Sequence, residues 1–147
     1  MQKKNKTMSN TPTPKIFIVE DEPFFANLIN FDLESKNYTD TKVFFTGEDC
    51  IANLHLNPDI VLLDHKLPGL SGLEVLKRIK AKNPDTHVIF LSGATGADIQ
   101  ISAFKYGAED FILKSENSFD EVKELLNEFV NNKSAQKSPN TKKYPSE

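Results

Sequence analysis

Short apolar runs alternate with longer amphipathic segments between residues 15 and 130. The short runs are continuous in apolar character and rich in β-branched or aromatic residues. That composition is typical of strands that are buried on both faces of a sheet. We therefore predict five buried strands, at residues 16–19, 43–45, 60–63, 88–91 and 111–113.

Each predicted strand is followed by the signals of a helix start. Pro23 suits a first helical position, and apolar residues recur behind it at helical spacing. The four later starts carry a Ser or Thr three residues before an acid, a pattern in which the hydroxyl accepts a hydrogen bond from a free backbone N–H group. The pairs are Thr46 with Asp49, Ser71 with Glu74, Thr95 with Asp98 and Ser118 with Glu121.

Five repeats of strand and helix predict an α/β fold, in which a parallel sheet is covered by helices on both faces. Such sheets bind ligands beyond the carboxyl ends of their strands, where the strand order reverses. We expect Phe24, Phe25, Phe44 and Phe45 to lie in or near the core of this fold.

The length and the ends of the chain indicate one domain with polar tails. A chain of 147 residues suits a single domain. Residues 1–14 and 131–147 are rich in Lys, Asn, Thr, Ser and Pro, and they hold too little apolar surface to offset the entropy of ordering. We therefore expect disordered tails on either side of a domain at residues 15–130.

Charge and composition argue against several classes of protein. The net charge of −3 gives no basic footprint for nucleic acid. No apolar run approaches the roughly 20 residues that span a bilayer. The single cysteine, Cys50, excludes an internal disulfide and favours a reducing compartment. We expect a cytoplasmic protein that binds neither nucleic acid nor membrane.

Polar residues follow four of the five predicted strands. Glu20 and Asp21 come after the first strand, Asp64 after the third, Ser92 after the fourth and Lys114 after the fifth. The carboxyl ends of parallel strands share one edge of the sheet, so we expect these side chains to converge. Acids held close together repel one another unless a cation compensates, and their oxygen atoms suit Mg²⁺.

This set of residues predicts a site of phosphoryl transfer. Asp64 is the candidate nucleophile, and its attack on phosphorus would give an acyl phosphate. Lys114 would bind a phosphoryl oxygen through its charge, and Ser92 would donate a hydrogen bond to another. A Mg²⁺ ion in such a site neutralises phosphoryl oxygens.

Four segments in this order resemble the receiver domains of bacterial two-component response regulators. They are residues 18–22 around the acidic pair, 59–72 around Asp64, 90–94 around Ser92 and 107–114 ending at Lys114. The resemblance covers residues 15–130 and points to a single-domain receiver of the chemotaxis or phosphorelay type. It implies a flavodoxin-like, doubly wound sheet of five strands in the order 2-1-3-4-5, with five helices.

The resemblance also assigns roles to single residues. Glu20, Asp21 and Asp64 would bind Mg²⁺ together with the backbone carbonyl of Lys66. Asp64 would be the phospho-acceptor and Lys114 its conserved lysine. Ser92 and the aromatic residue Phe111 would form the switch, in which the hydroxyl and then the ring move when the acceptor is phosphorylated.

The implied function is signalling, and not catalysis of an outside reaction. A sensor histidine kinase or a histidine phosphotransfer protein would donate phosphate to Asp64, and the domain would catalyse only its own phosphorylation and dephosphorylation. The output would be a changed protein-binding face for an unknown target, in a stand-alone domain that is a monomer or a phosphorylation-dependent dimer. The main alternative is a degenerate receiver that binds its partner constitutively.

Two other functions with a similar strand pattern fit less well. A phosphohydrolase with an aspartyl-phosphate intermediate usually needs a second carboxylate two residues after the nucleophile, where this chain has Lys66. A flavin mononucleotide protein needs a first loop that cradles phosphate, and the acidic loop at residues 20–22 would repel it. The three histidines are scattered and give no spacing typical of a zinc site.

Three residues depart from the family pattern. Phe111 stands where a Tyr is common and lacks its hydroxyl group. Ser115 follows Lys114 where a cis-proline is common, so we expect a trans bond and a different loop. Lys66, two residues after the acceptor, has a side chain long enough to lean over a phosphoryl group, and we hypothesise that it shields the group from water.

Overall fold

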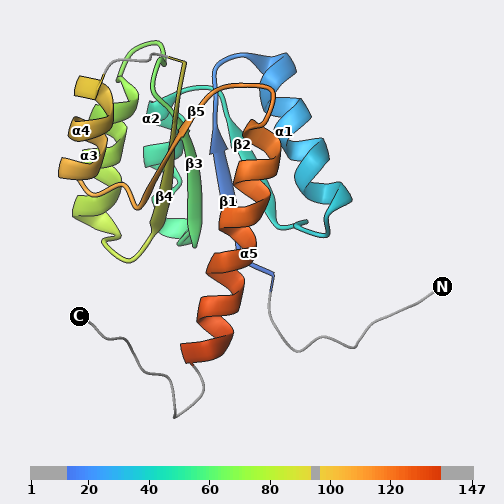
Figure 1. Ribbon diagram of the computed structural model, residues 1–147. Helices are drawn as coiled ribbons and strands as arrows, with labels where there is room; N and C mark the ends of the chain where they lie inside the picture. Colours follow the sequence, from blue (N-terminus) through green and yellow to red (C-terminus); the bar gives the residue numbers. More distant parts are fainter. Residues whose placement is uncertain (1–12, 94–96, 137–147) are drawn as a thin grey trace.

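The protein forms a single sheet with helices on both faces. The computed structural model describes residues 13–93 and 97–136, and strands and helices alternate along the chain (Figure 1). The elements are β1 Ile16–Val19, α1 Pro23–Ser35, β2 Thr41–Phe44, α2 Gly47–Ala52, the 3₁₀ turn η2 Leu54–Leu56, β3 Ile60–Asp64, α3 Gly72–Lys82, β4 His87–Ser92, α4 Ala97–Lys105, β5 Asp110–Leu113 and α5 Ser118–Gln136.

The sheet has the predicted topology. All of its pairings are parallel, and the strand order is β2-β1-β3-β4-β5. The chain moves outward from β1 to β2 and then returns to place β3 on the other side of β1. The strand order therefore reverses between β1 and β3, and the crevice above their carboxyl ends is the place where this fold binds ligands.

Each face of the sheet has its own apolar core. Ile16 and Ile18 of β1 point to the face that α1 and α5 cover, while Phe17 and Val19 point to the face that α2, α3 and α4 cover. All four of these side chains are almost fully buried. Burial on both faces explains why the central strands are continuously apolar in sequence.

Three of the predicted helix starts are confirmed. Pro23 is the first residue of α1. The hydroxyl groups of Thr46 and Ser71 accept hydrogen bonds from the backbone N–H groups of Asp49 (3.1 Å) and Glu74 (3.3 Å), so they cap α2 and α3. These caps fix where the two helices begin behind the edge of the sheet.

The start of α5 differs from the prediction. Ser118 is the first residue of the helix, and its hydroxyl accepts a bond from the N–H of Ser115 (2.7 Å) instead of capping through Glu121. The N–H of Glu121 bonds to the carbonyl of Asn117 (3.0 Å). The capping prediction at Ser118 was therefore wrong, because the hydroxyl closes the preceding turn. Thr95, the fourth predicted cap, lies outside the described residues.

The helix α5 is longer than the sequence suggested. We placed the start of a disordered tail at residue 131, but α5 continues to Gln136, so the prediction was wrong for residues 131–136. This stretch contains neither proline nor glycine, and a helix that is already nucleated can add polar turns at little cost. The other residues assigned to tails lie mostly outside the described part of the chain.

Two phenylalanines expected in or near the core are exposed. Phe44 is buried and Phe25 is partly buried, as expected, whereas Phe24 is 74% and Phe45 44% exposed. Phe24 lies on the solvent side of the first turn of α1, and Phe45 follows the edge strand β2. In the described part of the chain, no helix has the length and hydropathy needed to cross a bilayer.

Candidate functional site

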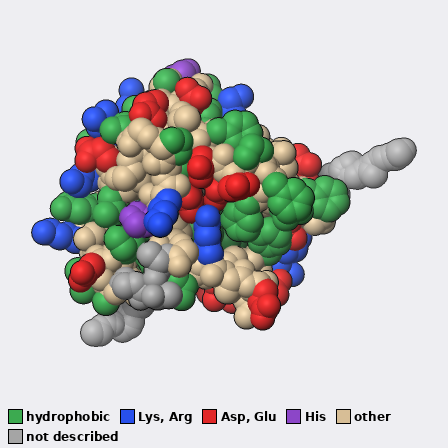
Figure 2. All heavy atoms as spheres, turned by 90° about the horizontal axis from the view of Figure 1, so that it is seen from above, with side chains coloured by type: hydrophobic (Ala, Val, Ile, Leu, Met, Phe, Trp, Pro, Cys, Tyr) green, Lys and Arg blue, Asp and Glu red, His purple; other side chains and the backbone are tan. Residues whose placement is uncertain are grey.

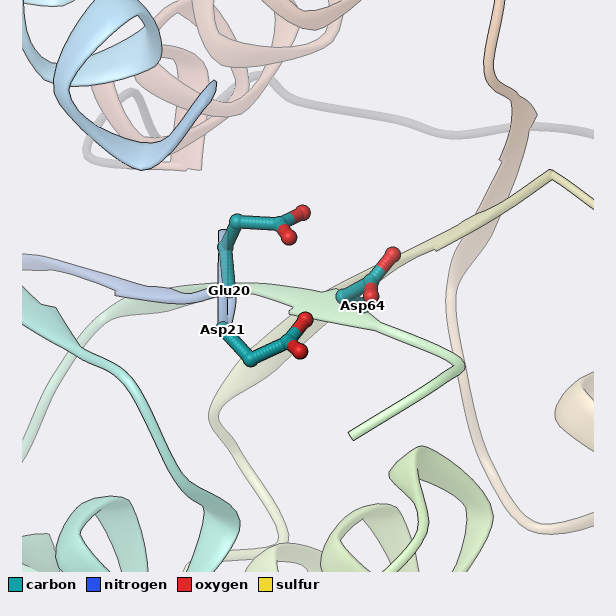
Figure 3. Close-up of side chains that lie close together, drawn as sticks. All are labelled: Glu20, Asp21 and Asp64. Atoms are coloured by element: carbon teal, nitrogen blue, oxygen red, sulfur yellow. The ribbon is translucent and has the colours of Figure 1, made fainter. Parts of the chain in front are cut away.

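The three acids predicted to converge lie together at the carboxyl ends of β1 and β3. Val19 pairs with Leu63 in the sheet, so Glu20 and Asp21 emerge beside Asp64, the last residue of β3. One carboxylate oxygen from each acid lies within 4.8 Å of the other two. Figure 3 shows the three side chains pointing toward a common space above the strand ends.

The loop after β3 holds Asp64 in a fixed position. The N–H of His65 donates to the carbonyl of Leu91 (2.8 Å), and the N–H of Gly72 donates to the carbonyl of His65 (2.9 Å). A Cβ on Gly72 would lie 2.3 Å from the carbonyl oxygen of Asp64. Only glycine allows this close return of the chain, so the loop and the first turn of α3 clamp the backbone of the acceptor residue.

Lys114 completes the cluster from the far edge of the sheet. Its Nζ lies 2.6 Å from Oδ1 of Asp64 and 2.9 Å from Oε1 of Glu20. Its backbone N–H donates to the carbonyl of Ser92 (2.8 Å), which attaches the end of β5 to β4. The Lys114–Ser115 bond is trans, as expected, since the described residues contain no cis peptide bond.

Burial sets the electrostatics of this cluster. It raises the pKa of Glu20, and the nearby charge of Asp64 adds to the rise although Lys114 opposes it. Burial also raises the pKa of Asp64, with a further contribution from Asp21 and opposition from Lys114. Burial alone would lower the pKa of Lys114, but its bonds to Asp64 and Glu20 outweigh this and raise it. The single positive charge of Lys114 therefore does not neutralise the negative charge of the three carboxylates.

The oxygen atoms of this cluster fit a small divalent cation. Among the described residues, these acids form the one group of three or more possible ligands close enough to share an ion. Carboxylate oxygens without nitrogen or sulfur ligands suit Mg²⁺ or Ca²⁺ and not zinc. The donor set therefore agrees with the Mg²⁺ expected from the sequence.

The remaining predicted residues lie around the acids. Ser92 is fully buried at the end of β4. The ring of Phe111 stacks on the buried ring of Phe90 (centroids 6.1 Å apart) and contacts Phe104 of α4 (6.5 Å). Phe104 is 45% exposed, so Phe111 stands between the core and the surface. Residues 94–96, which follow this part of the site and include part of one matching segment, lie outside the described residues.

Lys66 lies in the loop that follows Asp64. It is exposed, and together with Asp21, His65 and Ser71 it lines an open depression next to the acids. Its position beside Asp21 is compatible with the predicted role of its carbonyl group. His65 itself packs its ring 5.9 Å from that of Phe90.

One aromatic contact in this site was not predicted from the sequence. The Nζ atom of Lys114 lies 4.8 Å from the centroid of the Phe25 ring, on the first turn of α1. We had placed Phe25 only in or near the core. The contact joins two elements that are far apart in the chain, so no local pattern could reveal it.

The face that carries the acids also carries a broad apolar area. Figure 2 views the molecule from the side of the strand carboxyl ends and shows acidic groups near the middle, with apolar side chains beside them where α1 lies. The exposed large apolar residues of α1 are Phe24, Leu28 and Phe31. An apolar surface therefore borders the acidic cluster directly.

Comparison with known families gives one clear match. Residues 16–127 match the family described as "Response regulator receiver domain". Among curated proteins, a regulatory protein LuxO of Vibrio vulnificus is 38% identical over 76 residues, which are 51% of this chain and 17% of LuxO. The response regulator ArlR of Staphylococcus saprophyticus is 35% identical over 116 residues, which are 76% of this chain and 49% of ArlR. The chain thus spans half or less of the length of these relatives.

Solved structures show the same fold. The response regulator TrrA from Thermotoga maritima, solved in complex with Mg²⁺-BeF, is 32% identical with a TM-score of 0.70, and the match covers 78% of this chain and 97% of that one. The receiver domain of a LuxO repressor protein from Vibrio parahaemolyticus is 27% identical with a TM-score of 0.77, covering 89% of this chain and all of that one.

Proposed function

The chain belongs to the response regulator receiver domain family, and we propose that its Asp64 accepts a phosphoryl group beside a Mg²⁺ ion held by Glu20 and Asp21. Receiver domains are signalling phospho-acceptors that bind Mg²⁺ at an acidic site, and histidine kinases or phosphotransfer proteins phosphorylate them. The observation that carries the proposal is the convergence of three acids and Lys114 at the edge where β1 and β3 end.

Phosphoryl transfer from a phosphohistidine would proceed by displacement at phosphorus. A carboxylate oxygen of Asp64 forms a bond to phosphorus as the P–N bond breaks, and the imidazole leaves with the electron pair and takes up a proton. Lys114, 2.6 Å from Asp64, is placed to stabilise the charge on a phosphoryl oxygen. Burial of the acceptor strengthens that interaction, because the site is shielded from water.

Four residues would hold the metal. The carboxylates of Glu20, Asp21 and Asp64 face one space, and the carbonyl group of Lys66 lies in the loop beside Asp21. When bound, Mg²⁺ supplies positive charge that neutralises phosphoryl oxygens and offsets the repulsion among the acids. This compensation is what the raised pKa values of Glu20 and Asp64 call for.

The output of phosphorylation would be a change on the surface formed by α4, β5 and α5. In this proposal the hydroxyl group of Ser92 moves toward the phosphoryl group, and Phe111 repacks between Phe90 and Phe104. Phe104 is partly exposed on α4, so a movement of Phe111 would reach the protein surface. A target protein, or a second copy of the chain, would bind the altered face. Function without an attached output domain stays a prediction.

The apolar side of α1 is the surface that we propose for the phosphodonor. A donor histidine must reach Asp64, so the donor protein must cover the surface that borders the acids. Phe24, Leu28 and Phe31 lie on one side of α1, and they are 74%, 38% and 71% exposed. A row of this kind at the rim of the site suits an apolar helix of a histidine-containing donor.

The function is tested by incubating the protein with a small phosphodonor such as acetyl phosphate, with and without Mg²⁺, and measuring its intact mass. We expect one added phosphoryl group that requires Mg²⁺ and is absent from Asp64→Asn. A wild-type protein that gains no mass under these conditions would favour the degenerate receiver. A degenerate receiver would also bind its target equally well as wild type and as Asp64→Asn, with or without phosphodonor.

The docking surface is tested with autophosphorylated histidine kinase cores, using the core that transfers fastest. Phe31→Ser should slow this transfer at least tenfold and leave phosphorylation by acetyl phosphate unchanged. Ile101→Ser on α4, where the side chain is 63% exposed, is the matched control and should transfer at the wild-type rate. If Phe31→Ser accepts phosphate from the kinase as fast as wild type, this surface is not the docking site.

Lys66 is proposed to protect the phosphorylated state. Its exposed side chain borders the acidic cluster, and a lysine side chain is long enough to reach from there over a phosphoryl group on Asp64. Lys66→Ala should then shorten the half-life of the phosphorylated protein, measured as loss of the phosphoryl mass after removal of the donor. An unchanged half-life would exclude this role.

A further inference from the structure

Lys114 would contribute most to the proposed reaction if its ammonium group were already in place when a phosphoryl group arrives. A lysine side chain has four rotatable carbon segments, and fixing it costs conformational entropy. Its backbone is attached to Ser92, but that bond fixes only the start of the side chain. The groups that surround Nζ therefore decide how well the charge is positioned.

Two of these groups are the carboxylates of Glu20 and Asp64, at 2.9 and 2.6 Å. Both also belong to the acidic cluster that fits a divalent cation. With a cation bound, the carboxylates share their negative charge with it, and the cation repels the ammonium group. The ion pairs that hold Lys114 thus weaken under the conditions in which phosphoryl transfer would occur.

The third group is an aromatic ring. The Nζ atom lies 4.8 Å from the centroid of Phe25, within the range of a cation–π contact. The ring attracts the ammonium group through its quadrupole and not through a net charge, so a cation in the acidic cluster does not compete for it. The ring contact therefore persists when the ion pairs weaken.

Phe25 is itself held in place by a second ring. The centroid of Phe119, in the first turn of α5, lies 5.8 Å from that of Phe25, with an angle of 37° between the planes. Both side chains are partly buried against the core between the sheet and its α1–α5 face. The ring of Phe25 beside Lys114 is thus held by packing against Phe119 and the core.

The loop between β5 and α5, which contains no proline, brings Phe119 close to the site. The N–H of Ser115 donates to the hydroxyl of Ser118 (2.7 Å), and the N–H of Asn117 donates to the hydroxyl of Ser115 (3.1 Å). Ser118 is almost fully buried. These bonds fix the short turn that leads from Lys114 to Phe119.

We propose that Phe25, braced by Phe119, is a positioning residue that holds the ammonium group of Lys114 over Asp64. The inference rests on the proposed phosphoryl acceptor function. It adds a role for α1 within the site, separate from contact with a donor protein. Phe25 does not touch the reacting atoms and acts through Lys114.

The test compares Phe25→Leu, which keeps an apolar side chain without a π face, with Phe25→Tyr, which keeps the ring. Phe129→Leu is the matched control, because Phe129 packs against the same core and has Lys133 Nζ 5.4 Å from its ring, at the opposite edge of the sheet. Two quantities are measured: the rate of phosphorylation at saturating acetyl phosphate, and the order parameter of Lys114 Cε from carbon-13 relaxation, without phosphodonor, in metal-free protein and in protein with Mg²⁺.

Phe25→Leu should lower the saturated rate by between about twofold and tenfold and lower the order parameter of Lys114. The concentration of acetyl phosphate for half-saturation should stay within about twofold, and Phe25→Tyr should restore both wild-type values. Phe129→Leu should change neither the rate nor the Lys114 signal. Phe119→Leu should also lower the saturated rate and the order parameter of Lys114. It takes the place of Phe25→Leu in the test if Phe25→Leu does not fold.

A wild-type rate and order parameter in Phe25→Leu would overturn the proposal, as would an equal loss of rate in Phe129→Leu. A Phe25→Tyr variant that behaves like Phe25→Leu would also overturn it. The order parameter separates this inference from the proposed function, because it is measured without a phosphodonor. If the wild type takes up no phosphoryl group but Lys114 is ordered only when an aromatic ring is present, the function fails and the positioning contact stands.

Discussion

The two edges of the sheet both carry clustered charged groups but arrange them differently. At the carboxyl edge, Glu20, Asp21 and Asp64 share one ammonium group, that of Lys114. At the amino edge, where β4 and β5 begin, each of two acids has its own partner. Lys80 forms an ion pair with Glu109 (2.8 Å), and the ring of His87 lies within hydrogen-bond distance of Asp110 (2.6 Å).

The amino edge also satisfies its charges with backbone bonds. Nζ of Lys80 donates to the carbonyl of Thr86 (2.6 Å), and a carboxylate oxygen of Glu109 accepts from the N–H of Val88 (2.8 Å). Such a matched network holds α3, β4 and β5 together. At the carboxyl edge Lys114 bridges Glu20 and Asp64, but its single charge leaves an excess of negative charge that a further cation could neutralise. The difference teaches that charge imbalance, and not charge number, distinguishes a candidate site from a structural network.

Exchanging the two partly buried lysines, Lys114 and Lys80, for an apolar residue should separate the edges most clearly. Lys114→Met should slow phosphorylation by acetyl phosphate at least tenfold, because it removes the charge that would stabilise the transferred group. Lys80→Met should leave that rate within about twofold of wild type. Both rates are measured from the intact mass with time. A normal rate in Lys114→Met would contradict the role of this lysine.

Lys80→Met should instead lower the stability of the fold. Lys80→Met leaves Glu109 and the Thr86 carbonyl without their partner, so we expect a loss of about 1–3 kcal/mol in the free energy of unfolding. The loss is measured by urea unfolding in the absence of Mg²⁺. If Lys80→Met unfolds at the same urea concentration as the wild type, the amino edge is not a structural network.

Magnesium should stabilise the folded protein through the carboxyl edge alone. A ligand at 100 times its dissociation constant adds about 2.7 kcal/mol to the free energy of unfolding, provided that only the folded state binds it. We expect this gain in the wild type and in Asp110→Asn. Asp21→Asn should show a much smaller gain at the same Mg²⁺ concentration. The unfolding midpoints of the three proteins, with Mg²⁺ and with a chelator, give the comparison.

The raised pKa of Asp64 makes a prediction about pH in metal-free protein. Between the ordinary value of 3.8 and the raised native value, the folded state holds a proton that the unfolded state has released. Stability therefore falls as the pH rises through this window, and the loss is complete once the pH exceeds the raised native value. Asp64→Asn avoids the loss while Lys114 keeps Glu20 as a partner. It should be more stable than wild type near pH 7 without Mg²⁺.

This difference should shrink as the pH falls below 3.8, since both states of the wild type then carry the proton. Chemical unfolding of both proteins across this pH range provides the measurement. A variant that is less stable than wild type at neutral pH would show that Asp64 is stabilised by its surroundings and not strained by them.

The smallest effect is expected at the partly exposed pair of the amino edge. The side chains of His87 and Asp110 are 25% and 27% exposed, so water screens their interaction. Asp110→Asn should cost no more than about 1 kcal/mol in the free energy of unfolding and should leave phosphorylation unchanged. Loss of phosphorylation in this variant would mean that the two edges are coupled.

The sheet was predictable because its signals are local. Each central strand is a continuous apolar run with β-branched residues, α1 begins at the predicted proline, and α2 and α3 follow the predicted capping hydroxyl residues. Convergence of Glu20, Asp21 and Asp64 then follows from the parallel topology, which brings strand ends to one edge. The strand order came from resemblance to a family and not from the pattern alone.

Other features depend on contacts between distant segments or on competing local bonds. Phe24 has the same apolar character as the buried Phe44, and only the packing of α1 shows that it faces solvent. Ser118 fits a capping pattern, but its hydroxyl bonds to the preceding turn instead. The Phe25 contact with Lys114 joins α1 to the end of β5. None of these choices is encoded in the spacing of residues along the chain.

The central claim is that the imbalance of charge at the carboxyl edge is a site for a cation beside a phospho-acceptor. Crystals grown with Mg²⁺ and beryllofluoride, a stable mimic of a phosphoryl group, test it most directly. We predict a cation with oxygen ligands at about 2.0–2.1 Å among Glu20, Asp21 and Asp64. The mimic should be bound to Asp64 and contacted by Lys114. A cation found elsewhere, or an acidic cluster that stays without metal while Lys114 still bridges Glu20 and Asp64, would contradict the account.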